Sequence, residues 1–270
     1  MKRERAISFD ADVLDEAERR AGDDVSAFVN DAVRRELRTA AVTEAAVAGA
    51  RAAGIEGWRD AYLGALLDRD PRRAREVVEG AVLAGVDVAD LYIGVFGPVL
   101  AEIGHRWAME ELNVAHEHFA TSVTQALMVT VAPGSRAAPA GGRLAVVSSV
   151  PDELHTLGTQ MVADLLEREG WEVLMLGAAT PARDLAELVE MERPDVVALS
   201  ASTAGRLPGL AQVLPALTAL EPRPLIVAGG SLFTQEAAVV ALDLGADLVT
   251  SDVRVLLARL RERFPPVDGG

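Results

Sequence analysis

The chain has 270 residues, half of them hydrophobic, and a formal net charge of -15 at pH 7. It contains no cysteine, which excludes disulfide frameworks, thiolate metal sites and thiol nucleophiles. The acidic balance argues against general coating of nucleic acids, and the sequence has neither a signal-peptide pattern nor a membrane-spanning apolar run, so we expect a cytoplasmic, helix-rich protein.

Residues 1–41 have the pattern of one strand followed by two helices. "RAISFD" alternates and places Ile7 and Phe9 on one face, and "DADVLDEAERRAG" predicts a helix capped by Asp10 or Asp12. "DDVSAFVNDAVRRELRTAA" predicts a second, amphipathic helix. The core of such a segment is too small to fold as a monomer, so we expect two chains to form an intertwined dimer.

This segment resembles the ribbon-helix-helix modules of small repressors and antitoxins, in which strands from two chains pair and enter the DNA major groove. The resemblance implies a DNA partner and a homodimer or higher homo-oligomer. The residues that would contact DNA are Lys2, Arg3, Arg5, Ser8 and, through the phosphate-binding start of the second helix, Ser26. Ala6 cannot hydrogen-bond a base and Glu4 repels phosphate, so a module that only dimerises is the alternative.

Helical periodicity alone continues from residue 42 to 135, in segments joined by short loops. This pattern predicts an antiparallel four-helix bundle. The Pro/Gly/Ala-rich stretch "PGSRAAPAGGR" follows, and it places a linker at residues 136–143.

After the linker the period changes to short apolar runs. "LAVVSSV", "EVLMLG", "VVALSAS", "LIVAGG" and "LVTS" alternate with amphipathic helices. This alternation predicts a parallel sheet covered on both faces, hence a doubly wound α/β domain over residues 144–265. Binding sites in this class lie at the carboxyl ends of the strands.

The first of these strand ends carries "VPDELHTLGTQ", with Glu153, His155 and Gly158 spaced as E-x-H-x-x-G. A loop histidine at this position can reach a metal, and an acid two residues earlier can accept its other ring N–H. The glycine lets a large ligand approach the backbone. The alternative is a surface histidine beside an acid that caps a helix.

Two further strand ends follow this motif at long intervals. Between Gly158 and Ser200 lie 41 residues, and between Ser202 and the pair Gly229-Gly230 lie 26. With this spacing, the region from about 140 to 265 resembles the cobalamin-binding domain shared by corrinoid methyl carriers, methionine synthase and mutases. The pattern of that family is D-x-H-x-x-G, then S-x-L, then GG.

The resemblance implies His155 as the lower cobalt ligand and Glu153 as its hydrogen-bond partner. It also implies a channel for the nucleotide tail of cobalamin beside Gly158, lined by Ser200, Ser202, Gly229 and Gly230. Glu in place of Asp at 153 and Ser in place of Leu at 202 depart from the family's pattern. The first departure keeps the acid, and the second adds a polar group to the channel.

A second constellation lies upstream, in "WAMEELNVAHEH", where nine residues separate Trp107 from Glu117-His118. By itself it could be a core tryptophan followed by surface histidines. The helical stretch around it, however, resembles the caps that cover the upper face of the corrin ring, and the W-x9-EH pattern resembles adenosylcobalamin photoreceptors of the CarH type. The residues that would surround the upper ligand are Trp107, Val114, Glu117 and His118. His118 would be the candidate upper ligand after photolysis, whereas His105 and His116 receive no role.

The resemblance therefore implies a cobalamin-binding, light-responsive transcriptional regulator rather than an enzyme. Its sensor would be the Co–C bond of adenosylcobalamin, with methylcobalamin as the alternative cofactor, and its output the oligomeric or DNA-binding state. A ribbon-helix-helix-like start stands where photoreceptors of this sort usually carry a MerR-like module. Two other functions stay open: a corrinoid methyl carrier for a methyltransferase, and a cobalamin-sensing antirepressor that acts through a protein partner.

Overall fold

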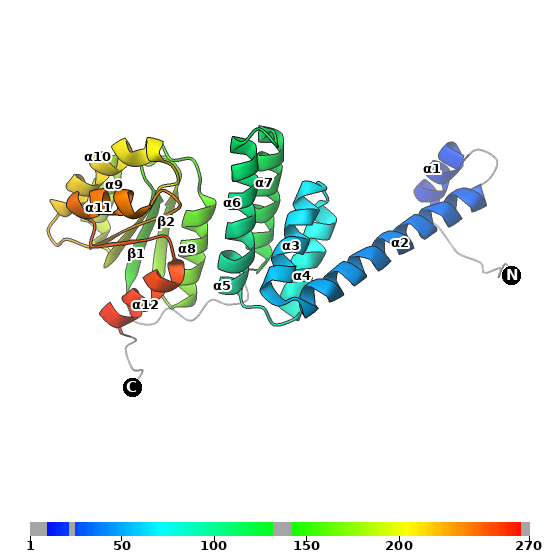
Figure 1. Cartoon of the computed structure of the whole chain (residues 1–270), viewed down its shortest axis with the longest axis horizontal. Coiled ribbons are helices and arrows are strands. Elements are labelled where there is room, and N and C mark those ends of the chain that lie inside the picture. The colour runs from blue at the N-terminus through cyan, green and yellow to red at the C-terminus, as the bar shows by residue number, and fades with distance from the viewer. Residues whose placement is uncertain (1–9, 22–24, 132–141, 266–270) are drawn as a thin grey trace.

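A computed structural model describes residues 10–21, 25–131 and 142–265. The chain forms an N-terminal helical hairpin, a helical bundle and an α/β domain (Figure 1). In these described ranges no helix is both long and apolar enough to cross a membrane.

The hairpin consists of α1 (Ala11–Ala21) and α2 (Val25–Ala52). The expected strand over "RAISFD", and with it Lys2, Arg3, Arg5 and Ser8, lies outside the described residues. Helix α2 continues past residue 41, where the sequence suggested a domain boundary, and reaches the bundle without a break (Figure 1).

The bundle contains the helices that the periodicity predicts, with one irregularity. Asp70 caps the second of them, since its carboxylate accepts the N–H groups of Arg72 and Arg73 next to Pro71. The segment after Asp87 passes through a π-helical turn between two α-helical parts. The elements are α3 (Gly54–Leu67), α4 (Pro71–Leu83), α5 (Val88–Leu91), η1 (Tyr92–Phe96), α6 (Gly97–Ala108) and α7 (Val114–Val131).

Aromatic side chains fill the bundle core. Tyr62 is fully buried, its ring lies 5.1 Å from that of Phe96, and its hydroxyl shares a 2.9 Å hydrogen bond with Thr124. Tyr92 and Trp58 are buried as well. The buried hydroxyl of Tyr62 thus has a hydrogen-bond partner within the core.

The α/β domain confirms the predicted class. Its five parallel strands run in the order β2-β1-β3-β4-β5. The three central strands are almost wholly buried because helices cover both faces, which explains their continuous apolar runs. The strands are β1 (Leu144–Ser149), β2 (Glu172–Gly177), β3 (Val196–Ser200), β4 (Leu225–Gly229) and β5 (Leu248–Thr250).

The strand order determines where a ligand can bind. The chain leaves β1 in one direction to reach β2 and returns on the other side to β3, so the loops after β1 and β3 diverge at a topological switch point. One side of the sheet packs against α8 (Leu157–Arg168) and α12 (Val253–Arg263). The other packs against α9 (Ala182–Glu192), α10 (Leu207–Thr218) and α11 (Gln235–Asp243).

Polar contacts join the bundle to the α/β domain at α5 and η1. The Tyr92 hydroxyl donates to Asp164 on α8 at 2.7 Å, and Arg168 pairs with Asp87 at 2.9 Å. Arg254, at the start of α12, pairs with Asp90 at 2.7 Å. The bundle therefore stands beside α8 (Figure 1), held at the same short segment that contains the π-helical turn.

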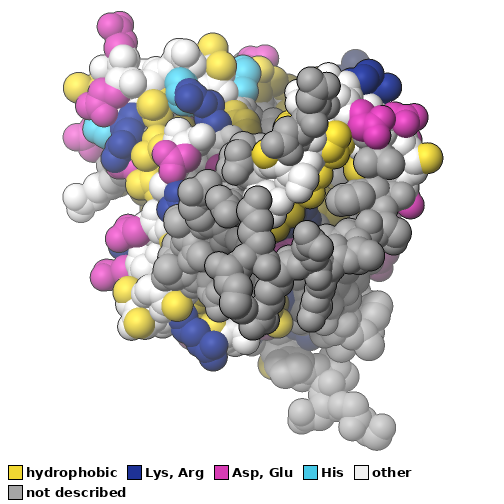
Figure 2. All heavy atoms as spheres, turned by 90° about the vertical axis from the view of Figure 1, so that its right-hand side faces the viewer, with side chains coloured by type: hydrophobic (Ala, Val, Ile, Leu, Met, Phe, Trp, Pro, Cys, Tyr) yellow, Lys and Arg dark blue, Asp and Glu magenta, His cyan; other side chains and the backbone are white. Residues whose placement is uncertain are grey.

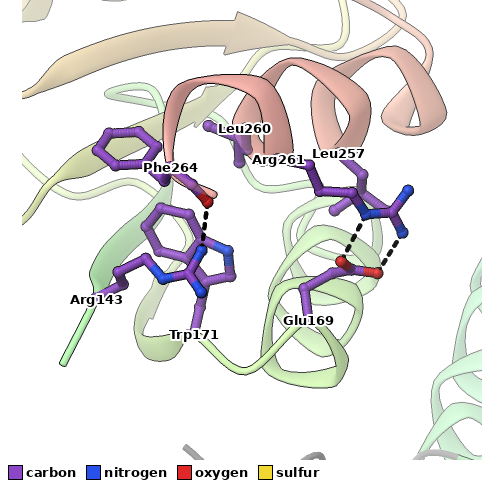
Figure 3. A pocket seen from close by; sticks show the side chains of 7 residues that line it. All are labelled: Arg143, Glu169, Trp171, Leu257, Leu260, Arg261 and Phe264. Atoms are coloured by element: carbon purple, nitrogen blue, oxygen red, sulfur yellow. Dashed lines mark hydrogen bonds and ion pairs between the residues drawn. The ribbon is translucent and has the colours of Figure 1, made fainter. Parts of the chain in front are cut away.

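A cavity of about 170 Å³ lies at the amino-terminal end of the sheet, where β1 and β2 begin (Figure 3). Arg143 stacks over Trp171 at 5.4 Å and donates to the Phe264 carbonyl at 2.6 Å. Arg261 forms two hydrogen bonds to Glu169. These contacts hold the end of α12 against the sheet. We therefore interpret the cavity as a structural feature of this packing rather than as a ligand site.

Candidate functional site

The loop after β1 brings the predicted acid and histidine together. Glu153 is fully buried, and its Oε1 accepts hydrogen bonds from the backbone N–H of His155 at 2.9 Å and from its ring Nδ1 at 2.6 Å. The imidazole itself is 61% exposed at the carboxyl edge of the sheet. The loop thus anchors one side of the ring and presents the other outward.

The second carboxylate oxygen of Glu153 contacts the loop after β3. Its Oε2 accepts from the backbone N–H of Ser202 at 2.8 Å and from the Ser202 hydroxyl at 2.5 Å. Arg206 Nε lies 3.8 Å from the same oxygen. The sequence did not predict this role for Ser202, which was expected to face a cofactor tail, and nothing in the sequence pointed to Arg206.

These contacts decide the charge of Glu153. Burial disfavours the charged carboxylate, but the hydrogen bonds from Ser202 and His155 outweigh burial and lower the pKa of Glu153 to about 2. At neutral pH Glu153 is therefore an anion that only accepts hydrogen bonds. In the neutral imidazole, the proton therefore lies on Nδ1 of His155, and Nε2 keeps the lone pair that a metal requires.

The predicted glycines lie around the same edge. A Cβ on Gly230 would come within 2.3 Å of the Ala201 carbonyl oxygen, and one on Gly229 within 2.9 Å of the Thr250 carbonyl oxygen. Gly158 faces Ser200, whose hydroxyl would be 3.7 Å from its Cβ. The glycines after β4 therefore allow neighbouring strand ends to approach more closely than any side chain would permit.

The second predicted group lies at the far end of the α6–α7 hairpin, level with the carboxyl ends of the strands (Figure 1). The Trp107 side chain is not in the bundle core: the residue is 46% exposed, and Val114 is 47% exposed. On the face drawn in Figure 2, the histidine side chains gather at this upper end. Trp107 and Val114 therefore place apolar surface at the open end of the α6–α7 hairpin.

His118 repeats the arrangement of His155. Its Nδ1 lies 2.7 Å from Glu117 Oε2, and the His118 side chain is 73% exposed. His116 differs, because Arg69 contacts its Nε2 at 2.9 Å and Asn113 contacts its Nδ1 at 2.8 Å. Of these two histidines only His118 therefore presents an open ring nitrogen. Ser26, the one predicted DNA contact within the described residues, is exposed in the first turn of α2.

The donor set suits cobalamin. Bound cobalamin would bring cobalt already held by its own ring, so the protein would need to add only a nitrogen donor, and a neutral imidazole with a fixed tautomer, as at His155, would suit that role. The glycine-lined strand ends beside His155 and the exposed Trp107 offer room and apolar surface for a bulky ligand.

Comparison with known families agrees with this geometry. Residues 143–260 match the B12 binding domain family, and residues 58–131 match a second family that is also described as a B12 binding domain. The first match covers the α/β domain with its Glu153–His155 loop, and the second covers the bundle with Trp107 and His118.

The chain is similar to a transcriptional repressor and to a corrinoid protein, among other relatives. The HTH-type transcriptional repressor CarH of Myxococcus xanthus is 32% identical over 185 residues, 67% of this chain and 60% of the repressor. The chain thus spans about 60% of that relative's length. Trimethylamine corrinoid protein 1 of Methanosarcina acetivorans is 24% identical over 202 residues, 73% of this chain and 92% of that protein.

A solved structure shows the same two-domain fold. The monomethylamine corrinoid protein of Methanosarcina barkeri superposes with a TM-score of 0.68 at 16% identity, over 78% of this chain and all of that one. The predicted arrangement of a helical cap before an α/β cobalamin domain is therefore confirmed.

Proposed function

We propose that this chain is a light-responsive transcriptional regulator that uses adenosylcobalamin as its sensor. The similarity to the CarH repressor, 32% identity over two domains, supports the regulator class. The side chains of His155 and His118 support adenosylcobalamin as the sensor.

The observation that carries the proposal is a pair of open imidazoles. His155 and His118 both have Nδ1 against a glutamate and Nε2 available, and both are exposed at the same end of their domains. A corrinoid methyl carrier would have to leave the upper face of the ring open for its partner enzyme. A second imidazole, such as that of His118, would therefore have no role in a carrier. We therefore assign His155 as the lower cobalt ligand and His118 as the candidate upper ligand after photolysis.

Each residue of the site would contribute a different part of binding. Bound adenosylcobalamin supplies a Co–C bond that light breaks. Trp107 and Val114 would shield the upper ligand, because both are apolar and exposed at the end of the bundle. Ser200, Gly229 and Gly230 would line the channel for the nucleotide tail, since they lie at the ends of β3 and β4.

The N-terminal hairpin would provide the dimerisation and DNA-binding surfaces that light regulates. A groove of about 520 Å³ between α1 and α2 is lined by apolar residues that include Val13, Phe28 and Val33. Figure 2 faces this end of the molecule and shows a strip of hydrophobic side chains open to the viewer. We propose that a second copy of the chain covers this groove, and that the dimer binds DNA near Ser26.

The test combines spectroscopy with DNA binding. Purified protein with adenosylcobalamin should change its visible spectrum irreversibly under green light, and the change should alter a gel shift with promoter DNA from its own gene. His155→Ala should greatly weaken cobalamin binding. A spectrum insensitive to light would refute the photoreceptor, and a gel shift that appears only with an added protein would indicate an antirepressor.

A corrinoid methyl carrier is the second candidate, because the chain covers 92% of the length of a trimethylamine corrinoid protein. In that case a methyl group on the bound cobalamin would turn over with a methyltransferase partner. Binding of methylcobalamin alone would not distinguish the two functions, so the measurement is methyl transfer in the presence of the partner enzyme.

A further inference from the structure

We propose that Arg206 binds the phosphate in the nucleotide tail of cobalamin, and that it makes this chain prefer corrinoids with that phosphate over corrinoids without it. The inference rests on the proposed function in taking cobalamin as the ligand and His155 as its lower ligand. It requires neither a response to light nor DNA binding, so it can be tested separately from both.

The guanidinium of Arg206 has hydrogen-bond donors that no described residue accepts. Its Nε is buried without a hydrogen-bond partner, and Glu153 Oε2, at 3.8 Å, is close enough for an ion pair but too far for a hydrogen bond. Three other described arginines have a buried nitrogen of this kind, but each donates through another nitrogen: Arg73, Arg143 and Arg168. Buried donors are normally satisfied, so Arg206 points to an acceptor on a ligand.

Arg206 is also the only lysine or arginine in the segments that lead from the five strands to the following helices. These segments, all of them described, are residues 150–156, 178–181, 201–206, 230–234 and 251–252. They contain three acids, Asp152, Glu153 and Asp252, and the whole chain has a net charge of -15. An anionic group that enters this edge of the sheet is therefore attracted only beside Arg206.

The chemistry of cobalamin brings a phosphate to this edge. In cobalamin the phosphodiester lies between the corrin ring and the ribose, and the base is at the far end of the tail. If His155 replaces that base below the ring, the base enters the channel beside Ser200, Gly229 and Gly230. The phosphate would then stay nearer the ring, at the mouth of the channel, where the loop after β3 carries Arg206.

The guanidinium can accommodate Glu153 and a phosphate at the same time. The Glu153 carboxylate already accepts hydrogen bonds from His155 and Ser202, and 28% of the Arg206 side chain is exposed. A guanidinium presents its donors in a planar fork that matches two phosphate oxygens. Helix α10 begins directly after Arg206, so the positive end of its dipole adds to the attraction for an anion.

The first experiment compares aquacobinamide, which has no phosphate, with cobinamide phosphate, which has one but no base. Absorbance titrations in the dark give a dissociation constant for each. Wild type should bind cobinamide phosphate about 10- to 100-fold more tightly, the range expected for hydrogen bonds to a charged group. Arg206→Gln should lose this preference, and Arg206→Lys should keep part of it, because lysine retains the charge but not the fork.

Arg193→Gln is the matched control. Arg193 is exposed just before β3, at the opposite end of the sheet, so this substitution removes the same charge and should leave the preference unchanged. The ratio of the two dissociation constants cancels any effect of Arg206 on Glu153 and His155, because both ligands meet the same imidazole. Binding of aquacobinamide by Arg206→Gln also reports that its site is folded.

Phosphorus NMR of bound hydroxocobalamin gives a second readout. The phosphodiester signal should have the same position in wild type and Arg193→Gln. In Arg206→Gln it should move, because the phosphate has lost its charged donor. An identical signal in all three proteins would contradict a contact between Arg206 and the phosphate.

The outcomes separate the role of Arg206 from the proposed function. Equal preferences for the phosphate in wild type and Arg206→Gln would overturn the role of Arg206 and leave the regulator intact. A preference that Arg206→Gln loses, in a protein whose adenosylcobalamin spectrum does not respond to light, would support that role and refute the photoreceptor. A wild-type protein that binds no corrinoid would refute both.

Discussion

At the scale of single residues, contacts rather than residue type distinguish the histidines of this chain. His155 and His118 each have one ring nitrogen against a neighbouring glutamate, whereas both ring nitrogens of His116 are engaged. Only a ring with an open nitrogen can become a metal ligand. His116 is therefore an internal control for any experiment on His118.

His118→Ala should bind adenosylcobalamin in the dark with little change in affinity. After green light its photoproduct should lack the spectrum of cobalt with two imidazole ligands, because the second imidazole is gone. The measurement is the visible spectrum before and after illumination. His116→Ala should behave like wild type, and an unchanged photoproduct in His118→Ala would refute the role of His118.

Gly230→Ala should destabilise the protein by about 1–3 kcal/mol, as is typical of overpacked sites. Gly230 has φ of 108°, and the new Cβ would meet the Ala201 carbonyl oxygen at 2.3 Å. Denaturant unfolding monitored by circular dichroism measures the change. Gly104→Ala on α6 is the matched control, because its Cβ would have no atom within 4 Å, and it should stabilise the protein slightly. Equal effects of the two substitutions would contradict the steric argument.

At the scale of elements, the bundle is built around two tyrosines with buried hydroxyl groups. Burial raises the pKa of Tyr62, and burial together with the hydrogen bond to Asp164 raises that of Tyr92. The folded state therefore holds both phenolic protons more tightly than the unfolded state. This contribution to stability is complete below the pKa of an exposed tyrosine, about 10, and is lost as the pH rises above it.

Because the chain has only these two tyrosines, ultraviolet absorbance of tyrosinate should show no titration near pH 10. The absorbance should instead appear together with the loss of helical circular dichroism at higher pH. Tyr62→Phe and Tyr92→Phe should each remove half of the signal. Titration of either tyrosine near pH 10 in protein that is still folded would show that its hydroxyl is accessible.

At the scale of the whole molecule, the three parts are joined in different ways. Helix α2 connects the hairpin to the bundle, while side-chain contacts at α5 and η1 join the bundle to the α/β domain. A change on the upper face of the cofactor would act on the end of the bundle farthest from those contacts. Such a change could then reach the hairpin through α2 as a rigid connection.

Val33→Asp should weaken self-association, because Val33 is 51% exposed and lines the apolar groove between α1 and α2. A charge there would lose its water if a second chain covered the groove. Light scattering after size-exclusion chromatography measures the mass in solution. Val239→Asp, at an exposed apolar position on α11, is the control, and equal masses for Val33→Asp and wild type would contradict a dimer formed through the groove.

The sequence by itself determined much of this protein. Short apolar runs separated by amphipathic segments predicted the parallel sheet, because strands covered on both faces must be apolar throughout. Helical periodicity likewise predicted the bundle helices, because an amphipathic helix repeats its apolar residues at a fixed local spacing. The loop that carries Glu153 and His155 predicted a ligand-binding edge, and the resemblance of its spacing to a known family implied cobalamin, which the match to the B12 binding domain family supports.

Only the tertiary structure decided which residues share the site. Ser202 contacts Glu153 across 49 positions of sequence, because the sheet places β3 beside β1, and no local pattern encodes that neighbour. The exposure of Trp107 and the π-helical turn at Tyr92 also depend on how the bundle packs rather than on helical periodicity. Local patterns determined the elements and the motif, whereas the partners that orient His155 come from strand order, which brings distant residues together.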